Sequence, residues 1–214
     1  MKTLRWILPA SLILLGVGGG FAPWVYRPPA ALQLTAPGLA EFVKFLAEAR
    51  LGLLPIQRLH FLLPLATAAL SLPLVAGNRQ LGLHWSLNGL LRLLVLPMSL
   101  ALLSPVWSPG VLLNQEFRLQ TFSAGAAVAL AIIAPLFKTI PLKYLTTSIA
   151  ALATLSLTLA LRQFYLVDDA IGVTYAGAIQ LGWGGWLTII ATTGLVISTG
   201  VEWNKILRRR TNDE

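Results

Sequence analysis

The chain has no cysteine, only two histidines and few charged residues. Without cysteine it can form no disulfide, thiolate metal site or cysteine nucleophile. His60 and His84 lie far apart in the sequence, which disfavours a histidine metal site. Charged residues make up 11% of the 214 positions and apolar residues 56%, whereas an average soluble domain is about 25% charged. So few charges could not cover the surface of a soluble protein of this size.

The apolar residues gather in long runs that carry almost no charge. Runs of about 18 or more apolar residues are typical of membrane spans. The sequence therefore predicts an all-α integral membrane protein, a single domain over residues 1–214 with a bundle of about six transmembrane helices. The expected spans are approximately 4–26, 59–77, 85–107, 122–137, 145–161 and 178–203.

The N-terminus has the pattern of a signal peptide. Basic residues at Lys2 and Arg5 precede an apolar core, and small residues follow at the spacing of a cleavage site. Pro23 after that site disfavours cleavage, and the run continues through Trp24–Tyr26, which suits the aromatic belt of a membrane interface. We expect an uncleaved signal anchor.

The basic residues lie at the ends of the apolar runs and predict the orientation. With the N-terminus inside, nine Lys or Arg residues fall in inner segments and six in outer ones. The inner set is Lys2, Arg5, Arg79, Lys138, Lys143, Lys205, Arg208, Arg209 and Arg210, and the outer set is Arg27, Lys44, Arg50, Arg58, Arg118 and Arg162. We expect both termini in the cytoplasm. Because the net charge of +8 follows membrane topology, we expect the lipid bilayer, and no nucleic acid, as the partner of these charges.

The longest predicted outer loop contains a short amphipathic segment. Thr35 and Pro37 are typical of a helix start. Leu39, Phe42, Val43 and Leu46 then recur at helical spacing, opposite Glu41, Lys44 and Glu48. The segment 37–50 is too short and too charged to span. We expect an interfacial helix that lies on the outer leaflet or caps the bundle.

Arg92 is the costliest charge in the sequence, because it lies inside an apolar run. His84, Asn88 and Arg92 are four residues apart and would form one polar stripe on a helix. The stripe could line a cavity or contact a partner. Alternatively Arg92 reaches the inner surface, or residues 80–92 form a surface helix ahead of the span. Glu202, at a similar expected depth in the last span, is the candidate ion partner of Arg92.

Asp168 and Asp169 are adjacent in the expected outer loop 162–175. Paired carboxylates can bind a divalent cation or act as acid and base. A solvated loop is the favoured explanation, since neighbouring side chains on an extended segment point in opposite directions.

Glycines and tryptophans alternate in Gly182–Trp186 at the start of the last span. The glycines permit close approach of another helix, and the tryptophans suit the interface. No P-loop, HExxH or GxSxG motif is present, and no span holds an acid at its middle. We therefore expect no catalysis and no cofactor or metal.

The stretches Ala22–Val25 and Leu39–Leu46 give the chain a family resemblance over residues 22–50. It resembles uncharacterised bacterial multi-pass inner-membrane proteins, some associated with ABC-type transporters. The resemblance implies a non-ATPase membrane component or accessory of a transport complex, which would need a separate ATPase. Two alternatives stay open: a structural or assembly subunit of a larger membrane complex, and an embedded enzyme that acts on lipid through Asp168 and Asp169.

Overall fold

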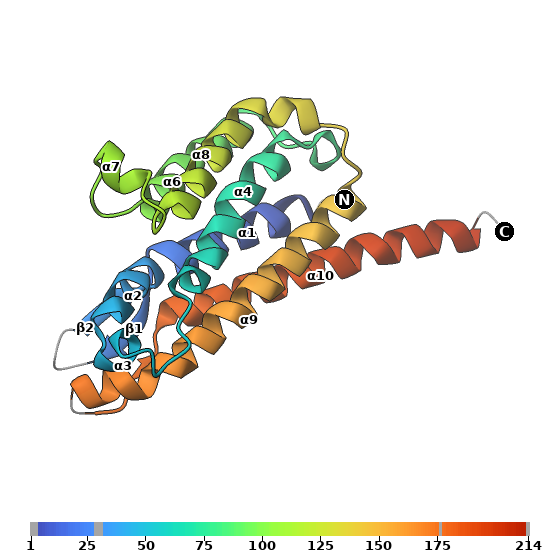
Figure 1. Ribbon diagram of the computed structural model, residues 1–214. Coiled ribbons are helices and arrows are strands. Elements are labelled where there is room, and N and C mark those ends of the chain that lie inside the picture. Colours follow the sequence, from blue (N-terminus) through green and yellow to red (C-terminus); the bar gives the residue numbers. More distant parts are fainter. Residues whose placement is uncertain (1–3, 28–31, 176, 213–214) are drawn as a thin grey trace.

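Six apolar helices lie side by side in a computed structural model that describes residues 4–27, 32–175 and 177–212 (Figure 1). Within these residues, five helices are long and apolar enough to cross a membrane. They cover Arg58–Gly77, Trp85–Leu102, Arg118–Phe137, Leu142–Thr174 and Trp183–Lys205. The sixth helix, α1 (Leu4–Gly20), is apolar but has 17 residues, about 26 Å at 1.5 Å per residue. A multi-pass helical membrane protein is therefore the class that the structure supports.

The helix α1 packs between α4 (Leu63–Gly77) and α10 (Trp183–Asn212). Leu8, Leu12 and Leu15 are fully buried there. Glycines allow this packing: a methyl group on Gly18 would lie 2.8 Å from the carbonyl oxygen of Gly184. The helix α10 does approach α1 closely at Gly184, but the glycine that makes room there is Gly18; methyl groups on Gly182 and Gly184 themselves would meet the backbone of residues 22–24, which follow α1.

The first and last predicted spans were wrong at their outer ends. The helix α1 ends at Gly20, and Pro23–Arg27 forms strand β1 instead of continuing it. Strand β1 lies between β2 (Leu32–Thr35) and β3 (Gln180–Leu181), both antiparallel to it. Pro23 has no N–H to donate, which disfavours continuation of the helix through it. The residues from Pro23 to Arg27 pair with other strands instead. Because β3 uses Gln180 and Leu181, the last helix begins only at Trp183.

Two other spans differ from their predicted bounds. The predicted span 85–107 is divided into α5 (Trp85–Leu93) and α6 (Val95–Leu102), because Pro97 offers no N–H to the carbonyl of Leu93. The predicted span 145–161 is part of the much longer helix α9 (Leu142–Thr174), since no proline or glycine interrupts it before Gly172. The fourth span is closer to its prediction, with α8 (Arg118–Ile133) followed by η4 (Ala134–Phe137).

The predicted interfacial helix is three short helical pieces that cap the bundle. They are α2 (Ala36–Phe42), η1 (Val43–Phe45) and α3 (Ala47–Arg50). The hydroxyl of Thr35 accepts a hydrogen bond from the Gly38 N–H at 3.2 Å, which confirms the predicted helix start. Leu39 and Val43 are buried, and α2 packs on η2 (Arg58–Leu62) at the start of the next helix.

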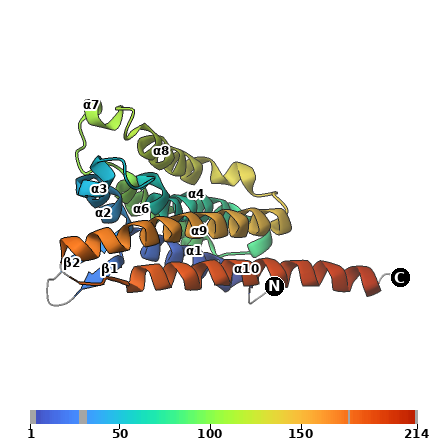
Figure 2. The same ribbon diagram turned by 60° about the horizontal axis from the view of Figure 1, so that its bottom comes forward.

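The connections gather at two ends of the bundle. Segments 21–27, 32–57, 103–117 and 177–182 meet at what we call the cap end, which also carries the short helix α7 (Pro109–Leu112). Segments 78–84, with the turn η3 (Arg79–Leu81), and 138–141 meet at the opposite tail end. There the Asn78 amide donates to the carbonyl of Ile140, and the Leu142 N–H donates to the Gln80 side chain, both at 2.8 Å. The start of α1 and the end of α10 also point toward the tail end (Figure 2).

Candidate functional site

The predicted polar stripe lies along α5, but its members have different surroundings. His84 caps the helix, with Nδ1 2.7 Å from the hydroxyl of Ser86. The Asn88 amide donates to the carbonyl of Leu83 at 3.5 Å, while its Oδ1 is buried without a partner. Arg92 is half-buried, and its Nε is also buried without a hydrogen-bond partner. The stripe is a helix cap followed by two incompletely bonded side chains.

Glu202 does not pair with Arg92. Its carboxylate lies 3.0 Å from the ammonium of Lys205, one turn further along α10. Within the described residues no ion pair reaches Arg92. The predicted pair was wrong because Lys205 is at helical spacing on the same helix as Glu202, and its flexible side chain can reach back to the carboxylate.

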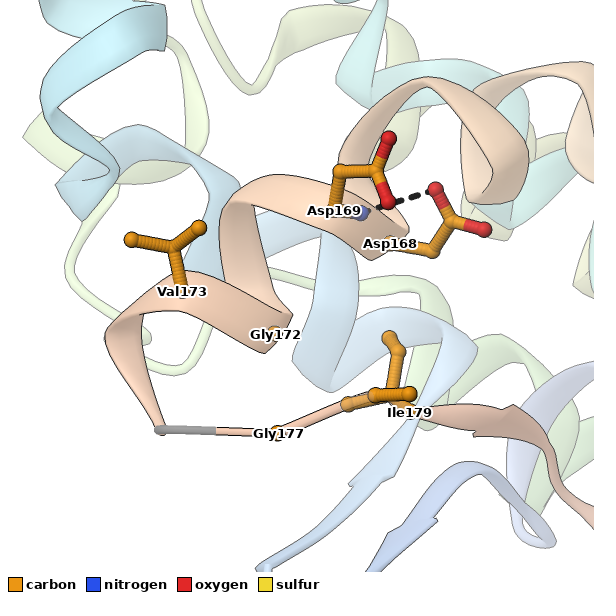
Figure 3. Close-up of a pocket in the computed structure, with 7 residues that line it drawn as sticks. Asp168, Asp169, Gly172, Val173, Gly177 and Ile179 are labelled. Carbon is orange, nitrogen blue, oxygen red and sulfur yellow. Dashed lines mark hydrogen bonds between the residues drawn. The ribbon is translucent and has the colours of Figure 1, made fainter.

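Asp168 and Asp169 lie on α9 and not in a loop, which corrects the prediction. They line a hollow of about 540 Å³ between the end of α9 and the segment 177–179 (Figure 3). The Asp169 N–H donates to the carboxylate of Asp168 at 2.8 Å. Among the residues that the structure describes, the rest of the lining is Gly172, Val173, Gly177, Ala178 and Ile179, with no nucleophile or basic side chain. Of the described residues, no three His, Cys, Asp or Glu side chains are grouped as metal ligands would be.

The strongest polar constellation lies at the cap end and joins three segments that are distant in the sequence. Glu41 of α2 binds Lys44 at 2.6 Å and Arg58 of η2 at 3.0 Å. Glu116, just before α8, binds Lys44 at 2.7 Å, and Arg58 donates to its carbonyl oxygen as well. Both cations also lie over the ring of Phe117, within 5 Å of its centroid. We call these five residues the cap cluster.

The cap cluster is electrically neutral and is held by its geometry. Two carboxylates face two cations, so the formal charges cancel. The hydrogen bond from Lys44 lowers the pKa of the Glu116 carboxyl, partial burial opposes this, and the charges of Lys44 and Arg58 add to the lowering. Arg58 is the most buried of the four charged members, 14% exposed, and bridges both acids. The cluster therefore fastens α2 to the start of α4 and to the connection before α8.

Three hollows surround α6 next to the cap cluster. One of about 430 Å³ lies between α2, the start of α4 and the end of α6, and includes Glu41, Ser104 and Gln120. A second of about 230 Å³ lies between α4 and α8, and Gln120 lines it too. A third of about 490 Å³ lies between α6 and α8 and includes Ser99. Leu100 and Leu103 line both the first and the third hollow, so α6 is their common wall.

Neither the cap cluster nor Gln120 was among the residues singled out from the sequence. Arg58 and Lys44 were counted there as outer charges, and Glu41 and Lys44 as part of the polar face of the amphipathic segment, because nothing in a single sequence shows which distant charges meet. Gln120 was placed outside the fourth span, which was expected to start at residue 122, whereas α8 starts at Arg118. An amide just ahead of an apolar run is the signal that could have found it.

No protein-family model matches the chain, and neither the curated proteins nor the solved structures give a match.

Proposed function

We propose that this protein is a non-enzymatic membrane component of a transport complex and works with a separate ATPase. In this proposal it lies in the bacterial cytoplasmic membrane with both ends in the cytoplasm. The observation that carries the proposal is the length of α10, which extends past the other helices at the tail end (Figures 1 and 2).

The helix α10 is too long for one crossing of a bilayer. Its 30 residues measure about 45 Å at 1.5 Å per residue, against about 30 Å of hydrocarbon. The part that is apolar enough to span ends at Lys205. Helical backbone continues to Asn212 and carries Arg208, Arg209 and Arg210 in the sequence. A helix whose sequence carries three consecutive arginines beyond its spanning part is suited to bind carboxylates of a partner protein.

The other connections at the tail end reach no further than the bundle. Segments 78–84 and 138–141 are short and bonded to each other, with the Arg79 N–H donating to the carbonyl of Lys138 at 3.2 Å. Because they are short and bonded to each other, these segments have little surface with which to bind a soluble subunit. The extension of α10 is therefore the part of the tail end that we propose as the contact with a separate ATPase.

Co-purification tests the proposal. The tagged full-length chain is isolated from its native membranes in a mild detergent, and ATP hydrolysis is measured in the isolated material. We expect ATPase activity with the wild type and with the combined variant Arg208→Lys, Arg209→Lys, Arg210→Lys. We expect its loss in the matched variant with glutamine at the same three positions. A wild-type sample without ATPase activity contradicts the proposal, and one that holds only other membrane subunits favours an assembly subunit instead.

A further inference from the structure

We propose that the hollows around α6 bind a neutral single-chain lipid, with its uncharged polar head at Gln120 and its acyl chain along α6 and α8. A monoacylglycerol is the class of molecule that fits: an acyl chain with a head of hydroxyl groups. This proposal is independent of the proposed transport role, because binding to the isolated chain can be measured without any partner.

The first argument is a buried amide without a partner. Gln120 is 5% exposed, and its Oε1 is buried with no hydrogen-bond partner. A buried polar atom that is left unbonded costs about 1–3 kcal/mol, so such groups are normally satisfied. Gln120 lines both the hollow beneath α2 and the hollow between α4 and α8. Side-chain atoms of Gln120 therefore border both hollows, and a turn of the carboxamide would bring its unbonded oxygen to a ligand hydroxyl group.

A second unpartnered group lies on the other side of the α6 wall. Ser99 is 4% exposed, and its hydroxyl has no hydrogen-bond partner. Hydroxyls on the neighbouring long helices bond back to their own backbone, as Thr154 and Thr192 do. Ser99 lines the third hollow, whose other lining residues are mainly apolar, such as Leu96, Leu112 and Val128. Two residues with unbonded polar atoms thus line the hollows that share α6.

Charge and size select the ligand class. The cap cluster beside the first hollow is neutral, because its two acids already bind its two cations. It leaves no free charge to hold a phosphate or an ammonium group. The walls are otherwise apolar, and the hollow of about 430 Å³ lies within the usual range of ligand pockets. The site also lies at the cap end of membrane-spanning helices, where a lipid head would be.

Photolabelling with matched variants tests the site. The probe is a monoacylglycerol with a diazirine in its acyl chain, added to the full-length chain in phosphatidylcholine nanodiscs. Labelled peptides are then mapped. We expect saturable labelling of α6 and α8 that unlabelled monoacylglycerol displaces. Gln120→Leu should weaken the affinity for the probe about fivefold, which is the loss expected when one neutral hydrogen bond to the ligand is removed. Ala101→Phe, which fills the first hollow, should abolish the labelling.

The control is Gln163→Leu, because Gln163 is also fully buried and has an unpartnered amide nitrogen, but lines none of the three hollows. Its labelling should equal that of the wild type. Thermal unfolding of each variant shows that it is folded. Equal labelling of Gln120→Leu and wild type would overturn the proposal. Displacement by phosphatidylglycerol as effective as by monoacylglycerol would also overturn it, since the hollows would then hold ordinary bilayer lipid.

Discussion

Replacing Gly18 by alanine adds one methyl group where α1 meets α10. That methyl group would lie 2.8 Å from the Gly184 carbonyl oxygen and 2.9 Å from the Thr188 nitrogen. Both atoms belong to the backbone, so no side-chain rotation can relieve the contact. The two helices must separate, although in a membrane they associate mainly through close packing.

The expected loss is about 1–3 kcal/mol, the usual cost of an added methylene group in a packed core. An opposing gain exists, because alanine is favoured over glycine inside a helix by about 0.5–1 kcal/mol. Gly200 separates the two effects. It lies on α10, and a methyl group added there would meet no neighbouring atom within 4 Å, so Gly200→Ala should show the gain alone.

The assay is unfolding of the purified chain in mixed detergent micelles, followed by circular dichroism. We expect Gly18→Ala to unfold at lower denaturant than the wild type, and Gly200→Ala at equal or higher denaturant. The two variants should differ by about 2 kcal/mol, which is the overpacking cost alone, because both variants carry the same helix gain. The reasoning is refuted if both variants shift in the same direction by the same amount.

Four further changes test other contacts by the same unfolding assay. Trp24→Phe should cost about 1–3 kcal/mol, because the buried indole N–H donates to the carbonyl of Gly18 at 2.8 Å; wild-type stability would contradict this. The pKa of Glu116 is lowered in the folded state from its ordinary value of 4.5. Its carboxylate therefore stabilises the folded protein at pH values above 4.5, and this stabilisation is lost as the pH falls through the folded-state pKa. Glu116→Gln should remove that part of the pH dependence, about 1 kcal/mol or less for so exposed a group. Arg58→Met should lower stability more than Arg58→Lys, which keeps one charge beside the two acids; equal losses would show that the ion pairs are not what holds the cap. Gln120→Leu should leave lipid-free protein as stable as the wild type or about 1 kcal/mol more stable, since an unpartnered buried amide is removed; a clear loss would mean that the amide is bonded.

The apolar runs of the sequence predict helices because a helix that crosses a bilayer must hydrogen-bond its own backbone N–H and C=O groups and present apolar side chains to the lipid. This local requirement predicted the helical membrane class, the cap on Thr35 and the packing role of Gly182–Trp186. It failed where tertiary partners decide. The residues after Pro23 are apolar enough to extend a span, yet they form β1 because β2 and β3 offer strands to pair with.

The sequence by itself determined that the chain forms apolar helices with basic ends, because hydrophobicity and charge are properties of each segment alone. Only the tertiary structure decided which polar groups meet. Glu202 binds Lys205 rather than Arg92. Arg58 meets Glu41 and Glu116, 17 and 58 residues away. Gln120 is left beside a hollow. Such contacts depend on how helices pack against one another, and packing is set by the fit of several faces at once, which no single segment encodes.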